Sequence, residues 1–163
     1  MSNVDEPLVL RNDSEGISTL TLNRPGALNA LSPLLFEELR SHLTDINESP
    51  SEVGVVVLTG KGKSFSAGND LKAIERGERA SSPHQQAETL DFMEEMRQPV
   101  IASVRGHCYT GALELVLACD LLICSTDAKF CDTHGKWGRV PTWGMTSRLP
   151  ERIGPIAARD LMY

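Results

Sequence analysis

Two glycine-bearing segments, each following an apolar run, carry the residue types that could do chemistry. The segment Ser64–Leu71 reads Ser-Phe-Ser-Ala-Gly-Asn-Asp-Leu, and Val104–Leu115 contains Gly111 and Glu114. Small residues let the backbone approach a ligand closely, and Gly68 permits dihedral angles that other residues avoid. Free N–H groups at the start of a helix favour an oxyanion or a phosphate. The pattern therefore predicts an anion-binding crevice with a carboxylate beside it.

The acidic and basic side chains near these segments have two interpretations each. Asp70 can cap the short helix expected after it, and a glutamate in a first helical turn, such as Glu114, often only stabilises the helix dipole. His134, in the run Cys131-Asp132-Thr133-His134-Gly135, is either an acid or base at neutral pH, oriented by Asp132, or a local hydrogen-bonding residue. The sequence alone leaves these alternatives open.

The elements that must position these residues alternate between strand and helix. Hydrophobic patterning predicts strands at 9–12, 17–22, 55–58, 100–104 and 121–124, and helices at 33–49, 71–74, 86–97 and 111–119. The first two strands form a hairpin, and Ser32 and Pro33 mark the first helix start. The later alternation favours parallel βαβ units in an α/β fold.

Two of these units share the order strand, glycine loop, helix. The β-branched run 55–58 is typical of a strand buried on both faces, and 100–104 is a second buried strand. If the two strands are close in one parallel sheet, the two helix N-termini face one crevice. We expect the residues 76–84 and 105–111 to form loops.

Composition excludes several classes of protein. The 163 residues are 40% hydrophobic and 23% charged, which is typical of a globular domain. Sixteen basic against 22 acidic residues give a net charge of −6, so no broad basic surface is expected for nucleic acid. The most apolar region, 112–124, is interrupted by Glu114 and Asp120 and is too short to span a membrane.

The N-terminus and the cysteines favour a cytoplasmic location. Residues 1–10 contain acids and a proline, which is unlike a signal or transit peptide. The four cysteines, Cys108, Cys119, Cys124 and Cys131, form no C-x-x-C pair, and we expect them to be reduced and buried. The spacing of Cys131 and His134 is that of half a zinc site, but no second pair accompanies it, so we expect no metal.

Three separated motifs resemble those of the crotonase, or enoyl-CoA hydratase/isomerase, superfamily. They are Leu22-Asn23-Arg24-Pro25-x-x-Leu28-Asn29-Ala30-Leu31, Phe65-Ser66-Ala67-Gly68-Asn69-Asp70-Leu71 and Gly111-x-x-Glu114-Leu115-x-x-x-Cys119-Asp120. The resemblance covers essentially the whole chain. It implies a spiral of β-β-α units, acyl-CoA thioester substrates, and assembly as a homotrimer or hexamer. The family's chemistry is an oxyanion hole of two backbone N–H groups that stabilises a thioester enolate, with no cofactor beyond the coenzyme A of the substrate.

The resemblance also implies roles for individual residues. The backbone N–H groups of Asn69 and Gly111 match the oxyanion hole, and Glu114 matches the first catalytic glutamate. His134 stands where hydratases carry the second one. The positions that match the substrate site are Arg24 near a phosphate, Ala27 and Leu28 along coenzyme A, Ala67 at the adenine, and the adjoining Gly68 and Asp70.

Two departures from the family pattern limit the expected activity. Besides His134, Thr142 stands where a glycine often comes, which leaves the shape of the acyl pocket open. The chain stops at Tyr163 inside an expected helix, so residues 1–163 are predicted to be an N-terminal core domain that lacks the family's helical C-terminal part. The leading expectation is reversible hydration of a 2-enoyl-CoA. The alternatives are double-bond isomerisation, C–C hydrolysis, or an inactive chain that binds coenzyme A or modulates assembly.

Overall fold

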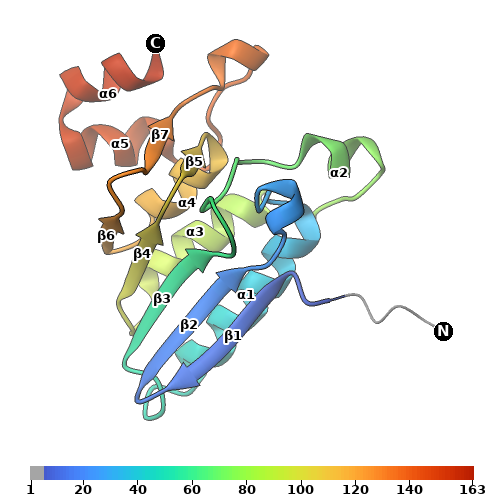
Figure 1. Cartoon of the computed structure of the whole chain (residues 1–163), viewed down its shortest axis with the longest axis vertical. Coiled ribbons are helices and arrows are strands. Elements are labelled where there is room, and N and C mark those ends of the chain that lie inside the picture. Colours follow the sequence, from blue (N-terminus) through green and yellow to red (C-terminus); the bar gives the residue numbers. More distant parts are fainter. Residues whose placement is uncertain (1–5) are drawn as a thin grey trace.

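The computed structural model describes residues 6–163, which are built around one five-stranded sheet (Figure 1). The strand order is β1-β2-β3-β4-β6, with β1 antiparallel to β2 and the other neighbours parallel. The strands are β1 (Val9–Ser14), β2 (Ile17–Leu22), β3 (Val55–Gly60), β4 (Val100–Val104) and β6 (Leu121–Cys124). The predicted hairpin and the predicted α/β alternation are both confirmed.

Six α-helices connect and flank the strands of the described residues. They are α1 (Pro33–Glu48), α2 (Leu71–Glu75), α3 (Gln85–Glu95), α4 (Gly111–Leu117), α5 (Met145–Ile153) and α6 (Pro155–Met162). The first helix begins as its sequence predicts, since the Ser32 hydroxyl accepts a hydrogen bond from the Leu35 N–H and Pro33 occupies the first turn. Helices α1 and α3 lie together on one face of the sheet (Figure 1).

The main core fills the space between the sheet and these helices. Alternate side chains of each central strand are buried, and those between them are half-buried, as Val56 and Val57 of β3 illustrate. The prediction that β3 is buried on both faces was therefore wrong in detail. The apolar stripe of α1 packs into the core through Leu35, Phe36, Leu39, Leu43 and Ile46, which are all buried.

The structure also contains a second, two-stranded sheet that was not predicted from the sequence. It pairs β5 (His107–Tyr109) in parallel with β7 (Lys129–Cys131), so the predicted loop 105–111 contains a strand. Three residues are too few to show a period, and the pairing joins segments about 20 positions apart along the chain. This small sheet places the residues around Gly111 beside those around His134.

The four cysteines are free but differ in burial. Cys108 and Cys119 are buried as predicted, and burial raises the pKa of the Cys119 thiol to about 12. Cys124 is exposed and Cys131 half-buried, so the prediction was wrong for these two. Cys124 lies on β6, one of the two edge strands of the main sheet, which has a neighbouring strand on one side only.

Two predictions concern membranes and the N-terminus. None of the helices within residues 6–163 combines the length and the apolar character that crossing a bilayer requires. The prediction that residues 1–10 are unlike a signal peptide falls partly on residues 1–5, which lie outside the described residues.

A buried asparagine fixes the loops that lead to the glycine-bearing segments. The Asn29 Nδ2 group donates to the carbonyls of Lys61 and Ser64 at 3.0 and 2.9 Å, and Oδ1 accepts from the Arg24 N–H at 2.9 Å. Its backbone has a φ of 52°, a conformation that asparagine tolerates better than most residues. Asn29 therefore links the residues after β2 to those after β3.

Replacing Asn29 with aspartate should destabilise the fold strongly. The substitution keeps the shape and the acceptor for Arg24, but it removes both donors and sets a buried charge against two carbonyl oxygens. We expect a loss of about 3 kcal/mol in the free energy of unfolding, measured by urea titration at pH 7. The exposed Asn12→Asp is the matched control and should change stability by less than about 0.5 kcal/mol. Equal midpoints for the two variants would contradict this account.

Candidate functional site

The two glycine-bearing loops meet at one edge of the sheet, as the sequence predicted. Strands β3 and β4 are adjacent and parallel, so the segments that follow them leave the sheet at the same end. A Cβ atom on Gly68, whose φ is +96°, would lie 2.6 Å from the Tyr109 carbonyl oxygen and 3.5 Å from the Gly111 nitrogen. Only glycine allows so close an approach in this conformation.

Backbone hydrogen bonds hold the loop around Gly68 in place. The Ala67 N–H donates to the Leu28 carbonyl at 2.9 Å, and the Leu31 N–H donates to the Gly68 carbonyl at 2.8 Å. By contrast, the N–H groups of Asn69 and Gly111 have no hydrogen-bond acceptor within residues 6–163. Both residues line one cavity of about 360 Å³. The cavity is lined by Asn69, Gly111, Glu114, His134, Gly138, Arg139, Val140, Thr142 and Trp143.

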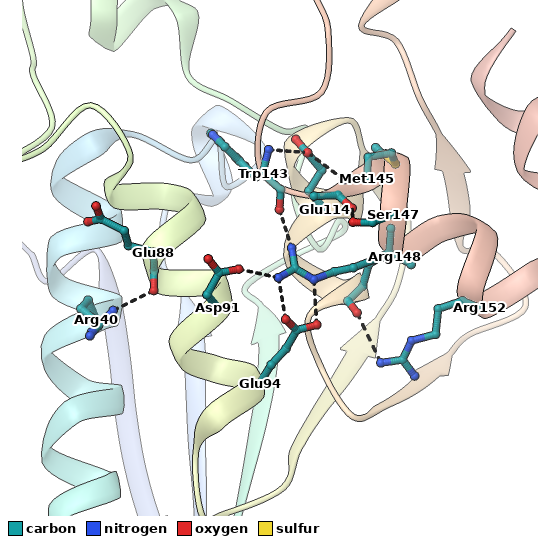
Figure 2. Close-up of polar contacts among 12 residues, drawn as sticks. Arg40, Glu88, Asp91, Glu94, Glu114, Trp143, Met145, Ser147, Arg148 and Arg152 are labelled. Carbon is teal, nitrogen blue, oxygen red and sulfur yellow. Dashed lines mark hydrogen bonds and ion pairs between the residues drawn. The ribbon is translucent and has the colours of Figure 1, made fainter.

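Glu114 is a buried carboxylate with one oxygen fully engaged. Its side chain is 1% exposed, and Oε1 accepts from the N–H groups of Trp143 at 2.8 Å and Met145 at 3.2 Å (Figure 2). Desolvation raises the pKa of Glu114, while these two N–H donors oppose the rise. The carboxyl therefore holds a proton more readily than an exposed glutamate, as a general acid or base at neutral pH requires.

His134 faces the second oxygen of Glu114. Its Nε2 lies 3.6 Å from Glu114 Oε2, and its Nδ1 lies 2.6 Å from Asp132 Oδ1. The His134 backbone N–H also donates to Asp132 Oδ1, at 2.9 Å. In a neutral imidazole the hydrogen bond to Asp132 assigns the proton to Nδ1, which leaves the Nε2 lone pair toward the cavity. The prediction that Asp132 orients His134 is confirmed.

Trp143 forms one wall of the cavity, although the sequence did not identify this residue as functional. A Cβ atom on Gly111 would collide with the Trp143 ring, so α4 begins with a residue that leaves room for the indole. The ring also packs edge-to-face on Phe36, with centroids 5.2 Å apart. The sequence offered only the nearby Gly138, Pro141 and Gly144 as a signal. A backbone N–H that binds Glu114 has no side-chain signature.

Arg24 and Asp70 are bound to each other. Arg24 Nη1 lies 2.7 Å from Asp70 Oδ2 and donates to the Ala30 carbonyl at 2.6 Å, while Asp70 Oδ1 caps α2 by accepting from the Ala73 N–H. Burial opposes ionisation of Asp70, but the bonds from Ala73 and Arg24 prevail and lower its pKa. The helix-capping interpretation of Asp70 is confirmed, and Arg24 is held by Asp70 and by the Ala30 carbonyl. A contact of either residue with substrate stays a prediction.

The other predicted substrate-binding residues surround the same loop. Ala27 is exposed and Leu28 half-buried, and the hydrogen bond between Leu28 and Ala67 brings these two backbones together. Ala67 lines a smaller cavity of about 80 Å³ together with Asn69 and His134. Whether these residues contact coenzyme A stays a prediction.

The described residues offer no assembled metal site. Within residues 6–163, no group of three or more His, Cys, Asp or Glu side chains is arranged to hold a metal ion. The expectations of no metal and no cofactor stay predictions.

Comparison with known proteins identifies relatives over nearly the whole chain. A family model described as enoyl-CoA hydratase/isomerase matches residues 12–163. A probable peroxisomal enoyl-CoA hydratase 1 from Arabidopsis thaliana is 37% identical over 97% of the chain and 60% of its own length. The chain thus spans about 60% of the length of this curated relative.

Solved structures agree in fold. An enoyl-CoA hydratase from Mycobacterium avium superposes with a TM-score of 0.80 at 41% identity, over 95% of this chain and 63% of that one. An enoyl-CoA hydratase from Bacillus anthracis gives a TM-score of 0.87 at 36% identity, over 96% of this chain and 62% of that one. The predicted crotonase-like fold is confirmed.

Replacing Glu114 with glutamine should stabilise the chain at neutral pH. Because folding raises the pKa of Glu114, the folded chain binds this proton more tightly than the unfolded chain does. The free energy of unfolding therefore falls as the pH rises from the pKa of the unfolded chain through that of the folded chain. The neutral amide avoids that loss and still accepts from the two N–H groups. We expect a gain of about 1 kcal/mol at pH 7, shrinking as the pH falls and the wild-type carboxyl protonates.

Urea midpoints across the pH range measure this difference. The matched control is Glu95→Gln, an exposed position on α3, which should shift stability by less than about 0.5 kcal/mol. A Glu114→Gln chain that is less stable than wild type at pH 7 would contradict the raised pKa.

Proposed function

We propose, since the chain belongs to the enoyl-CoA hydratase/isomerase family, that its site adds water reversibly to the double bond of a 2-enoyl-CoA. One observation carries the proposal: Glu114 Oε2 and His134 Nε2 oppose each other at 3.6 Å in a cavity that Asn69 and Gly111 also line. Hydration needs a group that activates water, a group that moves a proton at C2, and donors for the thioester oxygen.

The backbone supplies the donors in this proposal. The Asn69 and Gly111 N–H groups hydrogen-bond the thioester oxygen, on which negative charge develops as the enolate forms. Support comes from their shared cavity and from the missing acceptors for both groups within residues 6–163. Preorganised donors of this kind each contribute about 10²–10³ in rate.

The two side chains divide the proton transfers. One water molecule can hydrogen-bond to Glu114 Oε2 and His134 Nε2 at once. His134 Nε2 takes a proton from this water as its oxygen bonds to C3 of the substrate, and the Glu114 carboxyl gives a proton to C2. The raised pKa of Glu114 favours the protonated form that this step needs. A proton transfer from His134 back to Glu114 then restores the starting state.

Isomerisation is the second candidate, and His134 is the observation that favours it. With one acid or base replaced relative to the hydratase pair, a single group could move a proton from C4 to C2 without adding water. Two alternatives remain, and the assay below separates them from hydration. One is C–C hydrolysis, and the other is an inactive chain that binds coenzyme A or modulates assembly.

The proposal extends to the setting of the reaction. The substrate is an acyl-CoA of fatty acid metabolism, with coenzyme A as part of the substrate and no further cofactor. We propose a homotrimer or hexamer in the cytoplasm for the whole protein, supported by the family membership and, for the location, by the four free cysteines.

Crotonyl-CoA tests the reaction directly. The chain should remove the absorbance of the conjugated thioester and yield 3-hydroxybutyryl-CoA, identified by incorporation of ¹⁸O from labelled water. Glu114→Gln should lower kcat by about 10²–10⁴ with little change in coenzyme A affinity, because it removes only the proton-transfer group. Glu95→Gln is the control for the change of net charge. Undiminished turnover by Glu114→Gln would refute the mechanism.

His134 is tested by two substitutions that act at different atoms. His134→Gln removes the base, and Asp132→Asn weakens the interaction that fixes the Nδ1 proton, so both should lower hydration, by about 10²–10⁴ for His134→Gln. The pH profile of His134→Gln should also lose one limb. A structural role alone would lower the melting temperature and leave the profile of the remaining activity unchanged in shape.

A further inference from the structure

The orientation of Glu114 depends on a backbone turn. Both donors to its Oε1 come from the main chain of residues 143–145, and Gly144 between them has a φ of +108°. Because Oε1 is fixed by these two N–H groups, the direction of Oε2 toward His134 follows from where the turn lies.

The outer side of the same turn is bound by Arg148. Its Nη1 donates to the Trp143 carbonyl oxygen at 2.6 Å, while the Trp143 N–H donates to Glu114 (Figure 2). A Cβ atom on Gly144 would collide with this guanidinium. The turn is therefore held between the Glu114 carboxylate on one side and the Arg148 cation on the other.

Arg148 is itself fixed to a different helix. Its Nε and Nη2 donate to the two oxygens of Glu94 at 2.7 and 2.6 Å, and Nη2 also donates to Asp91 at 2.7 Å (Figure 2). Bidentate pairing fixes the plane and direction of a guanidinium as well as its distance. The side chain is 11% exposed, although its two carboxylate partners on α3 reach solvent.

We propose that Arg148 is a positioning residue for the reaction: anchored on Glu94 and Asp91, it sets the turn whose N–H groups aim Glu114 at His134. The inference rests on the proposed function for its kinetic readout. The competing explanation is that Arg148 only joins α3 to α5. In that case its loss should lower stability without a specific effect on Glu114.

The chain contains a matched control on the same helix. Arg152 follows Arg148 by one helical turn and also binds carbonyl oxygens across an interface, those of Leu117, Cys119 and Asp120. No hydrogen bond or ion pair within residues 6–163 joins Arg152 to the turn 143–145. Arg152→Met therefore removes a comparable guanidinium and leaves the support of Glu114 intact.

Steady-state kinetics with crotonyl-CoA give the first readout. Arg148→Met keeps the apolar stem, and we expect kcat to fall 10- to 100-fold, roughly the cost of misplacing a catalytic group by about 1 Å, with KM within threefold. Arg152→Met should keep kcat within threefold while lowering the melting temperature. Equal kcat values for the two variants at similar stability would overturn the proposal.

A double-mutant cycle gives the second readout. If Arg148 acts through Glu114, adding Arg148→Met to Glu114→Gln should lower kcat less than threefold further. A full additional 10- to 100-fold loss in the Glu114→Gln background would mean that Arg148 acts elsewhere. Arg148→Lys keeps the positive charge but loses the bidentate pairing with Glu94, and it should give an intermediate kcat. This variant replaces Arg148→Met in the test if Arg148→Met does not fold.

Amide hydrogen exchange decides the inference without any activity. We expect the Trp143 and Met145 N–H groups to exchange at least tenfold faster in Arg148→Met than in wild type, and at the wild-type rate in Arg152→Met. If wild type lacks hydratase activity, the proposed function fails while this exchange result still tests the positioning. Unchanged exchange at both amides would overturn it.

Discussion

The structure around the site depends on the burial of one carboxylate. Glu114 is 1% exposed, and a buried charge is costly unless other groups hydrogen-bond to it. Main-chain N–H groups provide most of that compensation, so the segment 143–145 must turn with alternate peptide groups facing Glu114. Gly144 adopts a φ of +108° within this turn, and Arg148 donates to the Trp143 carbonyl on its outer side. Desolvation nevertheless leaves the pKa of Glu114 above its ordinary value, and perturbed pKa values of this kind are common among functional residues.

The sheet contributes position rather than chemistry. Adjacent parallel strands β3 and β4 deliver two loops to one edge, and Gly68 lets those loops approach until Asn69 and Gly111 share a cavity. The small sheet of β5 and β7 then brings the segment of His134 alongside. The catalytic candidates thus come from three segments of the chain: Asn69 from the first, Gly111 and Glu114 from α4, and His134 from the third. The pairing of the strands holds these segments together.

Much of the fold followed from local chemistry. The hairpin, the capped start of α1 and the cap of α2 by Asp70 all depend on a few neighbouring residues, and the sequence predicted them. The strands β5 and β7 escaped prediction because their stability comes from pairing with a distant segment. Exposure of Cys124 was missed for a related reason, since an apolar run does not reveal that its strand lies at an edge of the sheet.

For the site, the sequence by itself determined which residue types stand at which spacing. The glycine-bearing segments pointed to Gly111 and Glu114. The family resemblance implied the roles of Asn69 and Gly111 and put His134 at the position of the second glutamate. Only the tertiary structure decided that Glu114 and His134 meet at 3.6 Å, that backbone N–H groups bind the carboxylate, and that Arg148 binds the Trp143 carbonyl behind them. The physical reason is that caps and turns are settled within a few residues. The distance between two side chains instead depends on packing across the whole domain, and a backbone N–H is the same in every non-proline residue.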